Sequence, residues 1–178
     1  GNDKFILTNI TDSADSFKGE QKVYSYFTAV ESSISNNLEL NVGLRSEHST
    51  QNVKTYKYYD PENPTSSGKL LMKDLLPSYT IIYKFSPEQR LKMSYGETIA
   101  RPDFRELSTV QYIEDETGYD VIGNNALKGT VIRNIDLRFE NYLEDADYFS
   151  VGTFYKKFIS PIEAMFQPGD KLIKTFVN

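Results

Sequence analysis

The sequence predicts an all-β fold in which about six antiparallel strands, arranged as up-and-down hairpins, form part of a large outer-membrane β-barrel. Three observations lead to this prediction: segments of alternating hydrophobicity, short polar turns that join them in pairs, and long polar stretches between the pairs. Side chains of a strand point alternately to its two faces, so alternation produces one apolar and one polar face. Short turns at one end and long loops at the other are the layout of an outer-membrane barrel wall.

The first predicted hairpin spans 23–45. Its second strand is the clearest in the chain, because every second residue is aliphatic: Leu38, Leu40, Val42 and Leu44. The connecting stretch is rich in Ser and Asn, whose side chains bond the local backbone and end strands. This hairpin therefore has one aliphatic and one polar face.

Two further hairpins are expected, over 78–100 and 131–158. The first turns at Ser86-Pro87-Glu88-Gln89 and the second at Glu144-Asp145-Ala146-Asp147. Pro77 and Pro102 bracket the middle hairpin, at positions where a missing ladder N–H is tolerated.

Three long outer loops are expected to follow the hairpins, over 46–73, 103–128 and 159–178. The last of these is interpreted as a loop that approaches a strand without forming one. No segment keeps an apolar period of 3.6 residues over three turns, so no helix is expected.

The composition excludes several classes of protein. The chain has 178 residues, a formal charge of −5, no cysteine, and 39% hydrophobic residues, with no run long enough for a membrane helix. Lys and Arg are scattered along the sequence, so we expect no nucleic-acid partner. Neither a Ser-His-Asp arrangement nor paired carboxylates are visible, and His48 is the only histidine, so no catalytic residue and no enzyme activity are predicted.

An ordered series of motifs resembles the barrel of TonB-dependent outer-membrane receptors. The most specific is the strand 94–107, which runs into Ala100-Arg101-Pro102. The turn 123–128 and the strands 134–140 and 150–157 resemble the family's next elements, in order, and pieces at 41–47 and 74–78 also match. In the turn, Asn125-Ala126 stands where the family often has Pro and an acidic residue. The resemblance covers roughly 23–163.

This resemblance implies a plugged barrel of about 22 strands that imports a scarce ligand across the bacterial outer membrane. The ligand would be an iron chelate, cobalamin, a glycan or a peptide. The expected partners are outer-membrane lipid and, through a plug, the TonB complex. No plug, TonB box or closing C-terminal strand is recognised, so we expect the chain to be a piece of a longer receptor, able to self-associate through its edge strands.

Candidate ligand-binding residues lie in the outer loops and at the rim. Tyrosine rings suit sugars and aromatic chelates, and arginine forks suit carboxylates. The alternatives are a self-packed loop or an aromatic belt for the tyrosines, and a purely structural rim for the other residues. The candidates are Tyr56, Tyr58, Tyr59, Arg101, Asp103, Phe104 and Arg105.

A second set of residues is expected to face the barrel lumen, because these residues alternate with aliphatic ones or belong to the same strands. If the sheet were soluble, the same side chains would face solvent. The set is Glu39, Asn41, Arg45, Lys92, Asp136, Arg138 and Glu140.

No metal site and no cofactor are predicted. The acidic stretch of Glu114, Asp115, Glu116 and Asp120 lacks the regular spacing of a calcium loop, and a solvated loop is the commoner structure.

Two other classes of protein remain open from the residues. A soluble all-β ligand- or carbohydrate-binding module would have shorter strands and would bury its aliphatic face against a second sheet. A passive porin-type barrel would share the wall but need no energy from the inner membrane.

Overall fold

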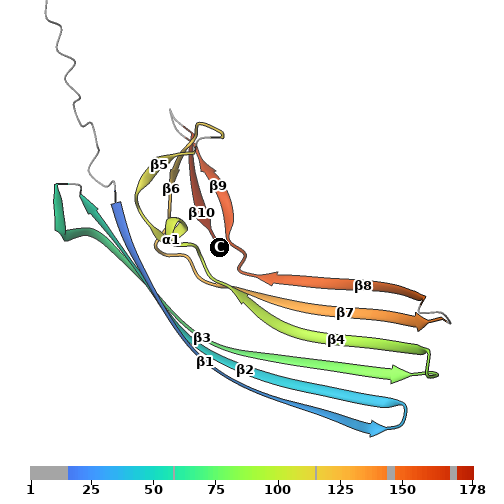
Figure 1. Ribbon diagram of the computed structural model, residues 1–178. Coiled ribbons are helices and arrows are strands. Elements are labelled where there is room, and N and C mark those ends of the chain that lie inside the picture. Colours follow the sequence, from blue (N-terminus) through green and yellow to red (C-terminus); the bar gives the residue numbers. More distant parts are fainter. Residues whose placement is uncertain (1–15, 58, 115, 144–146, 169–171) are drawn as a thin grey trace, which may run out of the picture.

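The computed structural model describes residues 16–178 apart from 58, 115, 144–146 and 169–171. The described part contains a large antiparallel sheet whose strands follow the order β1-β2-β3-β4-β7-β8 (Figure 1). The predicted sheet of six antiparallel strands is therefore confirmed. Its members are β1 (Ser16–Ser35), β2 (Leu38–Lys57), β3 (Asp60–Lys84), β4 (Gln89–Ala100), β7 (Thr130–Tyr142) and β8 (Tyr148–Ile159).

A smaller four-stranded sheet and one turn of helix form a second unit, called the cap below. In this sheet the order is β5-β6-β10-β9, and the β6–β10 pair is parallel. In Figure 1 the cap stands on the concave side of the large sheet, where β4 and β8 end. Its elements are α1 (Phe104–Leu107), β5 (Gln111–Ile113), β6 (Asp120–Ile122), β9 (Glu163–Gln167) and β10 (Ile173–Val177).

The register of the large sheet separates apolar from polar side chains. Leu40 pairs with Ile81, Ile81 with Met93, and Met93 with Leu137. The next row of paired residues, shifted by one position along each strand, consists of Asn41, Thr80, Ser94 and Asp136. Since adjacent residues point to opposite faces, the first row belongs to an aliphatic face and the second to a polar face.

The expectation of a loop over 46–73 is wrong. Residues 46–57 continue β2, and 60–73 belong to β3, with Glu47 opposite Asp74 and Val53 opposite Gly68. The stretch does not alternate between apolar and polar residues, because neither of its faces needs to be aliphatic. Pairing nevertheless satisfies the backbone groups, and β1 pairs along the same length. We call the parts of these strands on the far side of the row Thr28, Leu44 and Pro77 the strand extension. It comprises residues 16–27 of β1, 45–57 of β2 and 60–76 of β3.

The large sheet forks at Pro77. The Lys84 N–H donates to the Asn37 carbonyl oxygen of the β2 side (2.8 Å), whereas the Phe85 N–H donates to the Gln89 oxygen of the β4 side (2.9 Å). The backbone groups of successive residues in a strand bond to opposite neighbouring strands, so those of odd-numbered residues in β3 point toward β4. At Pro77 an N–H group would be needed for the next hydrogen bond to β4, and proline has no backbone N–H. The β3–β4 pairing accordingly ends at Ser78 and Gly96.

The stretches 103–128 and 159–178 also differ from the expectation of loops. They supply the cap, including the β9–β10 hairpin in the tail and the helix α1. One helical turn needs no apolar period, because its first turn is held by a capping box: the Asp103 carboxylate accepts the Arg105 N–H, and Glu106 accepts the Asp103 N–H.

The cap has a small apolar core that it shares with the large sheet. Leu107 and Leu127 from the cap are buried with Val53 of β2, and Phe104, Ile162 and Phe176 pack against them. The cap is thus a folded unit that rests on the strand extension.

Candidate functional site

The cap covers part of the polar face of the large sheet, over the strand extension. Val53 lies on this face, between Gly19 of β1 and Gly68 of β3. A Cβ at Gly19 would lie 2.7 Å from the Phe104 ring, and one at Gly68 would lie 3.0 Å from Asn125 Cβ. The two glycines therefore leave the space in which the cap sits.

Within the described part of the chain, no element covers the aliphatic face. Leu44, Ile81 and Leu137 each expose about 40% of their surface (41%, 43% and 40%). A soluble sandwich would bury this face under its second sheet. Here the second sheet lies on the other side.

Four charged residues meet under the cap, and we call them the rim cluster: Arg45, Glu47, Asp74 and Arg101. Arg45 Nε donates to Glu47 Oε1 (2.6 Å), and Arg101 Nη2 donates to the other oxygen of Glu47. Arg101 Nε also donates to Ser49 Oγ (3.0 Å). The Gln51 amide donates to the Pro102 carbonyl oxygen (3.0 Å), so the chain leaving β4 is tied to β2 at several points.

The two carboxyl groups of the rim cluster differ electrostatically. The aliphatic side chains of the sheet form a band that ends at Leu44 on β2. Both carboxyl groups lie beyond this aliphatic band, on the side away from the short turns. Hydrogen bonds from Arg101 and Arg45 hold the pKa of Glu47 below its usual value. Burial raises the pKa of Asp74, and the charge of Glu47 raises it further, while Arg101 opposes the shift. Asp74 Oδ2 is buried and accepts no hydrogen bond from another described residue.

Asp74→Asn is expected to raise the free energy of cap unfolding at neutral pH, by no more than about 1 kcal/mol. The raised pKa of Asp74 means that folding favours its protonated form, so its ionisation opposes folding at neutral pH. In the wild type this penalty disappears as the pH falls through the raised pKa toward the ordinary value of 3.8. The contribution of Glu47 has the opposite sign: it is complete above the ordinary value of 4.5 and is lost only as the pH falls through the lowered pKa.

Hydrogen exchange of the α1 amides, measured from pH 7 down to 4, tests this expectation. The advantage of Asp74→Asn should shrink as the pH falls. Asp136→Asn, an exposed carboxylate on the same face, is the matched control and should change nothing. Faster exchange in Asp74→Asn at pH 7 would contradict the assignment.

A hollow of about 330 Å³ opens beside the rim cluster, at the fork. Arg45, Glu47 and Arg101 line it from one side, and Ser78 and Thr98 from the two diverging strands. It offers hydroxyl and guanidinium donors together with a carboxylate.

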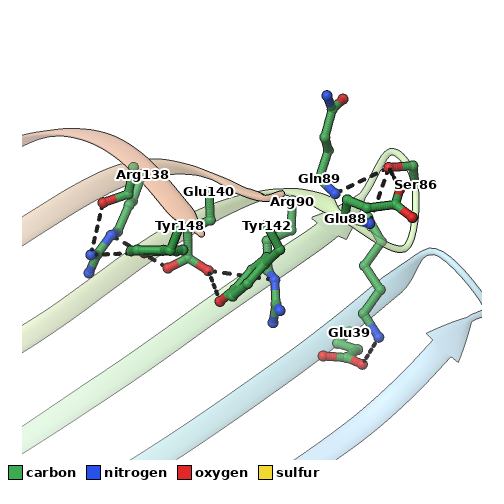
Figure 2. Close-up of polar contacts among 11 residues, drawn as sticks. Glu39, Ser86, Glu88, Gln89, Arg90, Arg138, Glu140, Tyr142 and Tyr148 are labelled. Atoms are coloured by element: carbon green, nitrogen blue, oxygen red, sulfur yellow. Dashed lines mark hydrogen bonds and ion pairs between the residues drawn. The ribbon is translucent and has the colours of Figure 1, made fainter. Parts of the chain in front are cut away.

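A second polar cluster lies near the short turns (Figure 2). Glu140, 8% exposed, lies between two arginines: Arg138 Nε is 3.4 Å and Arg90 Nε 3.5 Å from its oxygens. The Tyr142 hydroxyl donates to Glu140 (3.3 Å), and Arg138 Nη2 donates to the Tyr148 hydroxyl (3.1 Å). Two cations thus share one carboxylate at this end of the polar face.

Next to this cluster is a hollow of about 480 Å³. Gly152 stands opposite Arg138 in the register and leaves the space open. Lys92, Ser94, Asp136 and Phe154 complete the lining.

Comparison with protein families decides what the sheet belongs to. The family model described as TonB dependent receptor-like, beta-barrel, matches residues 2–173, nearly the whole chain. The chain belongs to the TonB-dependent receptor β-barrel family. No curated protein matches it. The family consists of outer-membrane receptors and transporters and is not an enzyme family.

In this TonB-dependent receptor barrel, the predicted ligand residues divide between two places. At the far end of β2, Tyr56 is half-buried, and Tyr59 is 72% exposed with Lys57 Nζ 5.8 Å from its ring centre. Tyr58 lies outside the described residues. The rim and cap hold the other four predicted residues.

Three of those four have structural partners. Arg101 binds Glu47, Asp103 is the N-cap of α1, and Phe104 packs against the cap core. Arg105 is exposed, with its guanidinium 5.3 Å from the Tyr112 ring centre. Arg105 is therefore the rim residue with most freedom to meet a ligand.

The residues expected to face the lumen share the polar face by register. They are Glu39, Asn41, Arg45, Lys92, Asp136, Arg138 and Glu140. Glu39 forms an ion pair with Lys84 of the neighbouring strand. Sequence reasoning missed Glu47, Asp74, Tyr142 and Tyr148 on this face. Continuing the alternation beyond Arg45 would have found Glu47.

The acidic stretch of the cap is engaged in local contacts. The Glu114 carboxylate binds Lys174 Nζ (2.7 Å) and the Thr117 hydroxyl (2.6 Å), and Asp115 lies outside the described residues. Among the described residues, no three His, Cys, Asp or Glu side chains are grouped to hold a metal ion. None of the described helices has the length and apolar character needed to cross a membrane.

Proposed function

We propose that this sheet is a wall segment of a receptor that actively imports a scarce ligand, with the polar face toward the lumen and the aliphatic face toward lipid. The observation that carries this proposal is the cap: it packs on the polar, concave face around Val53 and leaves the aliphatic face free. A lipid-facing wall must expose apolar side chains, while a lumen tolerates charge.

The alternatives have less support. A soluble binding module would have short strands, whereas β4 and β8 have 12 residues each and β3 has 25. About nine to eleven tilted residues suffice to cross a bilayer. A passive pore needs an open lumen, and a cap folded onto the lumen side would narrow it.

Ligand contact is proposed at the cap, at the fork and at the far end of β2. Tyr56, Tyr59 and Arg105 are the predicted residues that keep accessible surface and belong neither to the rim cluster, nor to the N-cap of α1, nor to the cap core. By register Tyr56 shares the outward side of β2 with Lys54, and the hollow at the fork adds Ser78 and Thr98 on the polar face. Aromatic rings with hydroxyl and guanidinium donors suit an iron chelate, a cobalamin, a glycan or a peptide.

Uptake by cells that express the whole receptor chain tests the proposal. Radiolabelled ferric chelate, cobalamin, oligosaccharide and peptide are offered to matched strains with and without TonB. At least one is expected to accumulate only when TonB is present. The Tyr59→Ala/Arg105→Ala variant should weaken binding of that ligand about tenfold, while Tyr83→Ala on the aliphatic face should not. Equal uptake in both strains would establish a passive pore instead.

A further inference from the structure

The outward surface of the strand extension gathers five lysines that are scattered in the sequence. The side chains beyond Leu44 on the aliphatic side of β2 are those of Ser46, His48, Thr50, Asn52 and Lys54. Lys54 pairs with Lys18 of β1, and Thr50 pairs with Lys22. On β3, Lys69 pairs with Asn52 and Lys73 with His48. All five lysines (18, 22, 54, 69 and 73) are exposed, and we call this surface the lysine face.

The positive charge of the lysine face is poorly balanced, although the chain as a whole carries a charge of −5. Glu20 is the acidic residue that the register places among these lysines, and it forms an ion pair with Lys22 (2.8 Å). Lys18, Lys54, Lys69 and Lys73 form no ion pair with a described residue. Lys18 and Lys54 stand directly opposite each other, an arrangement that destabilises a sheet unless an anion screens it.

The electrostatics of Glu20 agree with this crowding of cations. The hydrogen bond from Lys22 is the main cause of its lowered pKa, and the charges of Lys18 and Lys54 lower it further. Lysines on neighbouring strands thus act together on one point of the surface.

The lysine face continues directly into the aliphatic band. At the boundary lie Tyr26, which is 78% exposed, and the row that Tyr24 (64% exposed) and His48 form with Lys73. Amphipathic rings of this kind are typical of the boundary between acyl chains and headgroups. The cap covers the opposite face, so the lysines lie on the outside of the wall, just beyond the membrane.

We propose that the lysine face binds phosphate groups of a large, phosphorylated glycolipid headgroup in the leaflet around this end of the barrel. The row of Tyr24 and Lys73 is six residues from the row of Lys18 and Lys54, about 20 Å along the strands, or about 15 Å in height for a typical barrel tilt. A simple phosphodiester reaches only the lowest lysines. A saccharide that carries several phosphates reaches the whole series.

An acidic protein surface carries negative charge, as lipid phosphates do, and is the alternative partner for the lysine face. The tyrosine row and the continuity with the aliphatic band favour lipid, because a protein partner needs neither. The proposal depends on the membrane placement of the sheet, not on ligand uptake, so failure of the uptake experiment leaves it intact.

The test uses the whole receptor chain in detergent micelles, titrated with a bis-phosphorylated disaccharide lipid and, separately, with the same lipid after removal of its phosphates. The Lys69→Gln/Lys73→Gln variant should bind the phosphorylated lipid about tenfold or more weakly, since each lysine near an anionic headgroup contributes about fivefold. Affinity should fall with added salt. Lys69→Arg/Lys73→Arg should retain binding and shows that the chain folds.

The matched control is Lys128→Gln/Lys156→Gln, which removes the same charge from the cap and the polar face. Equal losses in the control and the test variant would overturn the proposal. So would equal binding of the dephosphorylated lipid, or an affinity that the test variant leaves unchanged. Capture of an acidic protein by the lysine face, without a preference for the phosphorylated lipid, would overturn it as well.

Discussion

Gly123→Ala is expected to unfold most of the cap. A Cβ at this position would lie against the carbonyl oxygens of Ser108 and Arg105, and 2.6 Å from that of Glu106. These are backbone atoms of α1 and its C-cap, so they cannot rotate away. The next amide, that of Asn124, donates to the Glu106 oxygen (2.6 Å) and would be displaced with it.

Overpacking of a well-packed site typically costs about 1–3 kcal/mol, and the backbone contacts at Gly123 put this substitution at the upper end of that range. The measurement is hydrogen exchange of α1 and β6 amides in the refolded receptor, compared with that of β7. Gly96→Ala is the matched control, because nothing lies within 4 Å of its added Cβ, and exchange should stay at the wild-type level. If both variants keep wild-type protection in the cap, the close approach at Gly123 is wrong.

Arg101→Ala is expected to release the cap from the strand extension without unfolding the six-stranded sheet. The substitution leaves Glu47, 7% exposed, beside Asp74 with Arg45 as its only remaining cation in the rim cluster. Loss of one partner of a buried pair costs about 2–4 kcal/mol, because the remaining charge stays desolvated.

Limited proteolysis of the receptor in micelles measures this release, with cleavage expected within 103–128. Arg105→Ala removes the same charge from the same segment but only an exposed contact with Tyr112, so it should resemble the wild type. A protected cap in Arg101→Ala would show that Leu107, Leu127 and Val53 hold it without the ion pair.

The sequence was sufficient to predict the half of the sheet near the short turns. Leu38 to Leu44, Ile135 to Phe139 and their partners alternate between aliphatic and polar residues, as the proposed contact with lipid on one face requires, and this alternation can be read directly from the sequence. Beyond Leu44 the alternation ends, and the sequence of a strand such as 46–57 looks like that of a loop because both of its faces are polar.

The rim cluster and the lysine face depend on register, which a single sequence does not supply. Glu47 and Asp74 are far apart in the chain, and only the β2–β3 pairing places them together. Lys18 and Lys54 meet in the same way across β1 and β2. The sequence pointed to Arg101 as a rim residue because Arg101 belongs to a family motif, but it did not point to its ion-pair partner Glu47.

Site-directed spin labelling tests the central claim, that the aliphatic face meets lipid and the cap-bearing face meets the lumen. The chain has no cysteine, so single cysteines can be introduced cleanly. In the whole receptor in liposomes, labels at Leu40, Ile81 and Leu137 should collide mainly with dissolved oxygen. Labels at Asn41, Thr80 and Asp136 should collide mainly with a water-soluble nickel chelate. Absence of this alternation, or its reversal, would contradict the claim.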